Sequence, residues 1–184
     1  MKEIRIHGRG GQGSVVLAEL LAMAAWEDGK FSQAFPFLGG GGERRGKPIQ
    51  AFARIHDQFI RLRSRVHHPD YVIVQDYTIL KEVDVLEGMK EGGTVFINTE
   101  KLLPLSDRKP LIQWIEVPAS TIAMEVMGRP LMNAALLGVF SQVTGEISFP
   151  SIEKAILKQF PGLIGQQNIE IAKKAYEYCQ KVKE

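Results

Sequence analysis

The sequence predicts an α/β fold: a Rossmann-like mixed sheet, mostly parallel, with helices on both faces and a β-hairpin insertion. Expected strands and helices alternate along most of the chain, which is the order typical of an α/β sheet. The chain opens with a strand, a glycine-rich turn and an apolar helix, the start of a nucleotide-binding βαβ unit. Because 184 residues are typical of one domain, we expect a single domain over residues 1–184.

The opening unit begins with Ile4 and Ile6, which alternate with polar residues and indicate a strand. His7–Gly13 follows directly, and an apolar helix is expected from Gln12 to about Asp28. The G-x-G-x-x-G spacing is made by Gly8, Gly10 and Gly13. Such glycines permit a tight turn and leave no Cβ in the way of an approaching phosphate or backbone. The free N–H groups and the positive helix end would then face an anion.

Phe31–Phe37 is expected to form the second strand, and a glycine-rich loop with Gly39–Gly42 follows it. Pro48–Ile55 and Phe59–Arg65 both alternate apolar and polar residues, so we expect them to pair as an antiparallel hairpin. This hairpin interrupts the alternation of strand and helix and makes the sheet mixed.

The rest of the chain predicts three more strands and five more helices. The strands are expected over Tyr71–Val74, Thr94–Ile97 and Ile112–Val117. The helices are expected over Leu80–Met89, Ala119–Met127 and Leu131–Val143, from Ser151 to the Pro161-Gly162 pair, and over residues 166–183. Cys179 lies on an apolar stripe of the last helix and is expected in the core.

Composition limits the possible functions. One cysteine excludes a disulfide framework, a cysteine-rich zinc site and a cysteine-held iron–sulfur cluster, and fits a reducing cytoplasm. The N-terminus has no signal-peptide pattern, and the longest apolar run, Val15–Trp26, is too short to span a bilayer. The formal net charge of +2 is uninformative about nucleic acid. We expect a cytoplasmic protein with neither nucleic-acid nor membrane partners.

The glycine turn has two interpretations. A dinucleotide fold needs an acid after the second strand to bind the ribose hydroxyls, and Gln33–Pro36 contains none. The glycines therefore either bind a nucleotide or only permit tight packing. The arginines of Glu43-Arg44-Arg45 suit phosphate or carboxylate, unless this is simply a solvated loop.

Other polar residues add one candidate. Asp76 follows a buried strand, where it would either contact a ligand or cap the next helix. His67-His68 has no third ligand at a suitable spacing, so no metal site is predicted. No catalytic triad or pair of catalytic carboxylates is recognisable.

Several of these segments together resemble the gamma subunit of 2-oxoacid:ferredoxin oxidoreductases, most closely the pyruvate type. The resemblance rests on His7–Gly13, Gln33–Pro36, Glu43–Pro48, Ala51–Ile55, and Asn133 with Leu137-Gly138. It extends over nearly the whole chain. One departure is the loop before Glu43, where the family usually has one glycine and one further residue and this chain has Gly39–Gly42.

The resemblance implies a subunit, inert alone, of a complex that converts a 2-oxoacid to acyl-coenzyme A and CO2 and passes electrons to ferredoxin. It implies thiamine diphosphate with Mg2+ on the alpha and beta subunits and iron–sulfur clusters on the beta and delta subunits, with no cofactor, metal or catalytic residue on this chain. Pyruvate is the expected substrate, with 2-oxoisovalerate and 2-oxoglutarate as alternatives.

The expected ligand or interface loop consists of Gly8, Arg9, Gly10, Gly11, Gln12, Gly13, Glu43, Arg44, Arg45 and Gly46, with Asp76 and Asn133 as further candidates. Arg9, Arg44 and Arg45 are the residues expected to contact coenzyme A phosphates. Two rival hypotheses are a free-standing nucleotide-binding module and a purely structural assembly subunit.

Overall fold

The computed structural model describes residues 1–37, 45–100 and 111–183. Within these residues, six strands form one sheet in the order β2-β3-β1-β4-β5-β6. Their bounds are β1 Lys2–Arg9, β2 Phe31–Phe37, β3 Pro48–His56, β4 Tyr71–Val74, β5 Thr94–Asn98 and β6 Gln113–Val117. Gly39–Gly42, Glu43 and Arg44 lie outside the described residues, so the expected glycine loop receives no structural account.

The sheet is mixed and mostly parallel, as predicted. Strands β1, β4, β5 and β6 pair in parallel, whereas β3 is antiparallel to both of its neighbours, β1 and β2. The parallel strands β4 and β5 are buried and almost wholly apolar, which is typical of strands that are covered on both faces.

The hairpin predicted from Pro48–Ile55 and Phe59–Arg65 is wrong. The antiparallel partner of β3 is β2, paired from Phe31 opposite His56 to Phe37 opposite Gln50. Residues 57–65 are irregular, and Phe59 and Leu62 are exposed. Because β1 and β2 already occupy the two edges of β3, no edge is left for a further strand.

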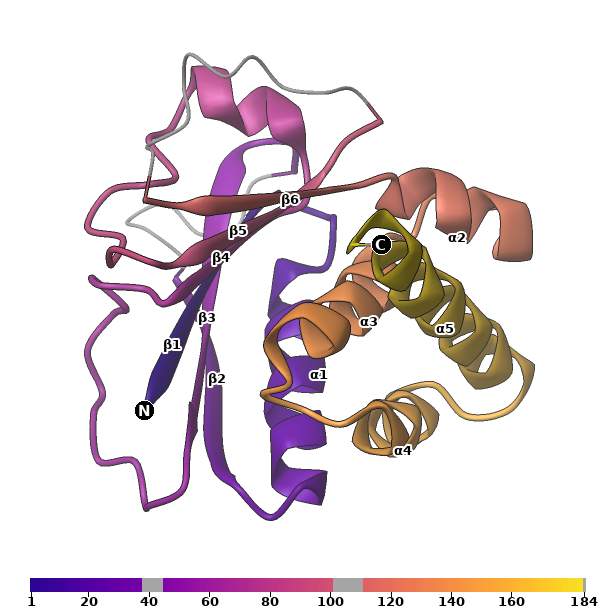
Figure 1. Cartoon of the computed structure of the whole chain (residues 1–184), viewed down its shortest axis with the longest axis horizontal. Coiled ribbons are helices and arrows are strands. Elements are labelled where there is room, and N and C mark those ends of the chain that lie inside the picture. Colours follow the sequence, from indigo (N-terminus) through magenta and orange to yellow (C-terminus); the bar gives the residue numbers. More distant parts are fainter. Residues whose placement is uncertain (38–44, 101–110, 184) are drawn as a thin grey trace.

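Five α-helices lie on one side of the sheet (Figure 1). In the described parts of the chain they are α1 Ser14–Glu27, α2 Ala119–Met127, α3 Asn133–Thr144, α4 Phe149–Gln159 and α5 Leu163–Lys183. Helix α1 packs on β1, β2 and β3, and α3 packs near β5, while α4 and α5 cover these two helices. The core on this side contains Ile4, Ile6, Ile73 and Phe96 from the strands. Cys179 of α5 is also buried there, as predicted.

The opposite face of the sheet carries no α-helix among the described residues, so the helices expected on both faces are represented there only by a 3-10 helix. A short 3-10 helix, η1 (Tyr77–Lys81), and the turns after it pack on Val72, Val74, Val95 and Ile97. The α-helix predicted over Leu80–Met89 is therefore wrong. The Asp84 side chain accepts a hydrogen bond from the Leu86 amide at 2.9 Å, and such a local turn competes with a helix.

The two faces of β1 differ in chemistry. Ile4 and Ile6 belong to the core under the α-helices. Since successive side chains of a strand point to opposite faces, the buried Arg5 and His7 lie on the face away from the α-helices. None of the helices within the described residues is long and apolar enough to cross a membrane.

Candidate functional site

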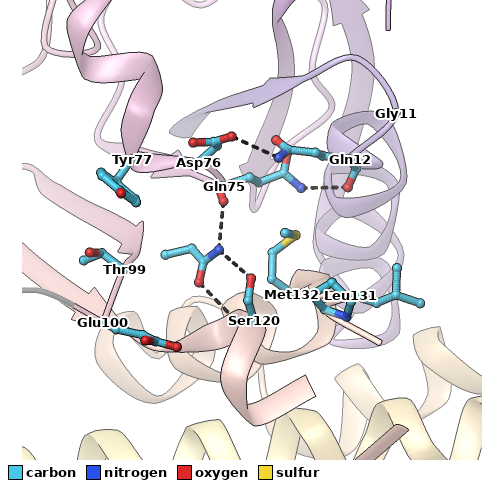
Figure 2. A pocket seen from close by; sticks show the side chains of 12 residues that line it. Gly11, Gln12, Gln75, Asp76, Tyr77, Thr99, Glu100, Ser120, Leu131 and Met132 are labelled. Carbon is cyan, nitrogen blue, oxygen red and sulfur yellow. Dashed lines mark hydrogen bonds between the residues drawn. The ribbon is translucent and has the colours of Figure 1, made fainter. Parts of the chain in front are cut away.

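A pocket with a volume of about 600 Å3 lies beyond the carboxyl ends of β4 and β5 (Figure 2). Its lining consists of Gly11, Gln12, Gln75, Asp76, Tyr77, Asn98, Thr99, Glu100, Ser120, Pro130, Leu131 and Met132. From β1 the chain continues toward one edge of the sheet, and from β4 toward the other. Open α/β sheets bind ligands at such a reversal of strand order.

Gln75 is the buried centre of the polar network beside this pocket. Its Oε1 accepts a hydrogen bond from the Ser14 hydroxyl, and its Nε2 donates to Asn133 Oδ1 at 2.6 Å. The same Nε2 donates to the Gln12 carbonyl at 3.2 Å. One amide thus joins β4 to the glycine turn, to the start of α1 and to the start of α3.

Two glycines of the turn are required by this network. A Cβ on Gly8 would lie 2.1 Å from Gln75 Oε1 and 2.2 Å from Ser14 Oγ, so a larger residue would displace both side chains. Gly13 has a φ of 76°, which side-chain-bearing residues rarely adopt, and its carbonyl accepts a hydrogen bond from Asn133 Nδ2 at 3.1 Å. The structure thus assigns Gly8 and Gly13 a packing role.

Arg9 is engaged by protein groups on all of its side-chain nitrogens. Nε lies 3.1 Å from Asp76 Oδ2, and Nη1 donates to the Gly46 carbonyl at 3.1 Å. Nη2 donates to Thr78 Oγ1 and to Glu82 Oε1, both at 2.7 Å. This geometry does not support the expected contact of Arg9 with a phosphate, because two carboxylates already neutralise its charge.

Of the two roles left open for Asp76, the structure shows the helix cap. Asp76 caps η1, since its Oδ1 accepts hydrogen bonds from the Thr78 amide at 2.9 Å and the Thr78 hydroxyl at 2.6 Å. It also lines the pocket and accepts a hydrogen bond from Gln12 Nε2 at 3.3 Å. Burial raises the pKa of Asp76. The hydrogen bonds from Thr78 and Gln12 and the charge of Arg9 together lower this pKa by more than burial raises it, so the net pKa falls below its usual range.

The glycine turn His7–Gly13 and the loop that contains Gly46 contact each other through backbone hydrogen bonds. The Gly10 amide donates to the Lys47 carbonyl at 2.9 Å, and the Gly46 amide donates to the Gly10 carbonyl at 3.0 Å. The Arg9 amide donates to Gln12 Oε1 at 2.7 Å. These N–H groups are therefore satisfied inside the chain and do not face an anion, which favours the packing interpretation over a dinucleotide cradle.

The other wall of the pocket is built around Asn98, which the sequence analysis did not identify. Asn98 Nδ2 donates to the Gln75 carbonyl at 2.9 Å and to Ser120 Oγ at 2.8 Å, and its Oδ1 accepts a hydrogen bond from the Ser120 amide at 3.1 Å. Figure 2 shows Gln75 and Ser120, which these hydrogen bonds connect across the wall of the pocket. Gln75 directly follows β4 and Asn98 is the last residue of β5, and this position at the carboxyl ends of buried strands could have identified both.

Some of the predicted site residues lie apart from the pocket lining. Arg45 is exposed and forms a parallel bridge with Gly10 outside the named strands. Among the described residues, no group of three or more His, Cys, Asp or Glu could hold a metal ion.

Comparisons with known proteins point to one family and extend over nearly the full length of this chain. A family model described as pyruvate ferredoxin/flavodoxin oxidoreductase matches residues 3–178. The pyruvate synthase subunit PorC of Methanocaldococcus jannaschii is 50% identical over 176 residues, which are 96% of this chain and 96% of that protein. The pyruvate/ketoisovalerate oxidoreductases common subunit gamma of Thermococcus litoralis is 46% identical over 181 residues, again 96% of both chains.

A solved structure shares the fold. The pyruvate oxidoreductase subunit PORC of Thermotoga maritima superposes with a TM-score of 0.81 at 36% identity, and the match covers 96% of this chain and 95% of that one. The family match, the two relatives and this structure all bear out the resemblance noted in the sequence. This chain belongs to the pyruvate ferredoxin/flavodoxin oxidoreductase family, among its gamma-type subunits.

Proposed function

We propose that this chain is the gamma subunit of a complex with alpha, beta and delta subunits that oxidatively decarboxylates pyruvate. The complex would form acetyl-coenzyme A and CO2 and pass two electrons to ferredoxin. The observation that supports this most strongly is identity of about half to a pyruvate synthase subunit over 96% of both chains.

The cofactors of the reaction are proposed to lie on the other subunits. An iron–sulfur cluster held by cysteine needs four of them, and this sequence has one. The described pocket lining carries the carboxylates of Asp76 and Glu100 and no lysine or arginine, so it does not fit a diphosphate. We therefore derive no catalytic step from thiamine diphosphate or Mg2+ on this chain.

Substrate choice is also proposed to lie outside this chain. The name of the Thermococcus litoralis relative describes a gamma subunit common to pyruvate and ketoisovalerate oxidoreductases. A subunit shared by two enzymes cannot by itself distinguish their substrates. By analogy, we propose that the gamma subunit contributes to assembly and to the surroundings of the active site rather than to recognition of the 2-oxoacid.

For coenzyme A, the remaining candidates are Arg44 and Arg45, since the charge of Arg9 is neutralised by Asp76 and Glu82. The expected effect of Arg44→Ala with Arg45→Ala is a higher KM for coenzyme A with kcat preserved. The matched control is Arg63→Ala, at another exposed position. An unchanged KM for coenzyme A in an assembled complex would leave these loops a purely structural role.

The proposed function is tested by coexpressing the four subunits and assaying the purified complex. Reduction of viologen or ferredoxin is measured with pyruvate, 2-oxoisovalerate and 2-oxoglutarate, each with and without coenzyme A. We expect the highest kcat/KM with pyruvate and dependence on coenzyme A. A complex that contains this chain and turns over another acid faster would refute the substrate assignment, and failure of the chain to join the complex would refute the subunit assignment.

A further inference from the structure

A second pocket, with a volume of about 340 Å3, lies on the face of the sheet away from the α-helices. It is separate from the pocket at the carboxyl ends of the strands. Its lining consists of Arg5, Phe37, Gln50, Phe52, Arg65, Val66, His67, His68, Glu87 and Gly88. Two arginines and two histidines therefore line this pocket against one carboxylate. This volume is at the lower end of the range for small-molecule sites, roughly 300–1,000 Å3.

Arg5 is a buried cation to which no carboxylate of the described residues is bound. The residue is 5% exposed. Its Nη2 donates to the Val85 carbonyl at 3.0 Å and to the Glu87 carbonyl at 2.6 Å. Its Nε is buried and has no hydrogen-bond partner among the described residues. A buried charge is costly unless it is paired, so this guanidinium is ready to accept an anion.

Arg54, on the neighbouring strand β3, provides an internal comparison. Its guanidinium is also buried and donates to two backbone carbonyls, those of Ser64 and Arg65. In addition, its Nε donates to Glu3 Oε1 at 2.9 Å, so its charge is paired. Glu3 lies opposite Arg54 in the sheet, whereas the residue opposite Arg5 is Phe52. Among the described residues, Arg5 thus donates to two backbone carbonyls, as Arg54 does, but has no bound carboxylate.

A second cation is held at the same pocket. The guanidinium carbon of Arg65 lies 4.5 Å from the centre of the Phe37 ring, and both residues line the cavity. Stacking on an aromatic ring orients the planar guanidinium while leaving its N–H groups available for a ligand. The Nδ1 atom of His68 is 3.1 Å from the Gly88 carbonyl, a contact that joins two walls of the pocket.

We propose that this pocket binds a small oxyanion, a phosphate or carboxylate group, between Arg5 and Arg65. Both groups suit arginine because its N–H fork matches their oxygen atoms. Burial lowers the pKa of Arg5 by more than the nearby charges of Glu87 and Asp84 raise it. The guanidinium nevertheless stays charged at neutral pH, because the ordinary pKa of arginine is so high. Glu87 is exposed and is the one carboxylate residue in the described lining of the pocket.

The test uses the isolated full chain and does not depend on assembly of the complex. Inorganic phosphate and acetate are titrated separately into the 15N-labelled chain, with sodium chloride at equal ionic strength as the reference. We expect saturable shifts of the Arg5 and Arg65 Nε–Hε signals with at least one of the two probes and not with chloride. The probe that binds identifies the group, tetrahedral or planar, that the pocket prefers.

Two variants and one matched control decide the assignment. Arg65→Gln removes an exposed cation of the pocket and is expected to weaken binding of the anion by about tenfold. Arg5→Met, if the variant folds, is expected to weaken binding by about the same factor. Arg63→Gln removes a nearby exposed arginine that does not line the pocket and is expected to leave the affinity unchanged. The proposal is overturned if neither probe binds saturably, if Arg65→Gln keeps the wild-type affinity, or if Arg63→Gln weakens binding as much.

Discussion

At the residue scale, the buried amide of Gln75 does most to define the candidate site. It is fully buried, and its bonds to Ser14, Gln12 and Asn133 connect segments that are far apart in the sequence. A buried amide that loses a partner keeps its desolvation cost, so each bond in such a network depends on the others.

The bond between Gln75 and Asn133 is tested by a double-mutant cycle. We expect Gln75→Ala and Asn133→Ala each to lower the free energy of unfolding by about 1–3 kcal/mol. The double variant should lose less than the sum, with a coupling energy of about 0.5–3 kcal/mol. Urea unfolding measures all four proteins.

A distant amide serves as the control for this cycle. Gln113 is exposed at the amino end of β6, whereas Asn133 lies beyond the carboxyl ends of the strands. Asn133→Ala and Gln113→Ala should therefore be additive within about 0.5 kcal/mol. Additivity of the Gln75 and Asn133 changes themselves would contradict the network.

His7 makes a residue-scale prediction about pH. Burial, and secondarily the charge of Arg5, lowers the pKa of His7 from 6.5 to about 3. Between these values the unfolded chain binds a proton that the folded chain does not. The corresponding stability is fully present above pH 6.5 and is lost as the pH falls toward 3.

In His7→Gln this contribution disappears. As the pH falls, we expect the unfolding free energy of His7→Gln to decrease less steeply than that of the wild type. The two slopes should differ by up to about 1.4 kcal/mol per pH unit. Urea unfolding between about pH 4 and 7 measures the slope. His67→Gln, at an exposed position, is the matched control. A wild-type slope in His7→Gln would show that His7 does not carry the proton linkage.

At the element scale, Arg9 connects the glycine turn His7–Gly13 to the loop that contains Gly46 and to η1. Its bonds reach Gly46 on one side and Asp76, Thr78 and Glu82 on the other. We expect Arg9→Gln to increase hydrogen exchange several-fold at the amides of Gly46 and Thr78, with Arg63→Gln as the unaffected control. Exchange rates that stay at the wild-type value at both amides would rule out this role for Arg9.

The elements also show how far the sequence could predict the fold. The strands Phe31–Phe37 and Tyr71–Val74 and the helix Ala119–Met127 were predicted with their observed bounds, because apolar periodicity and the flanking glycine or polar residues agree there. Phe59–Arg65 has the alternation of a strand, but alternation carries no information about whether a sheet edge is free. The expected helix at Leu80–Met89 fails for a local reason, the turn that Asp84 makes with Leu86.

The sequence could also predict only part of the candidate site. Asp76 and Asn133 were identified, and both belong to the observed network. Gln75 and Asn98 were missed, since an amide has no motif of its own and acquires its role from the strands that end beside it. The position of each at the carboxyl end of a buried strand was the available signal.

At the scale of the whole molecule, the sheet separates two different environments. The α-helices cover one face of the sheet (Figure 1) and enclose a large apolar core with it. The other face combines a small apolar cluster with buried arginines and a histidine. The glycine turn lies near the boundary between them and is bonded into the fold by its own N–H groups. This organisation fits a subunit whose loops pack against other parts of an enzyme better than a free-standing nucleotide-binding module.

The subunit assignment is tested most directly by omission. The alpha, beta and delta subunits are prepared together without this chain, and coenzyme A-dependent reduction of viologen by pyruvate is measured before and after the purified chain is added. We expect little activity without the chain and recovery that saturates at one equivalent of gamma subunit per set of the other three. Full activity in the absence of the chain, or no recovery upon its addition to an otherwise intact complex, would contradict the assignment.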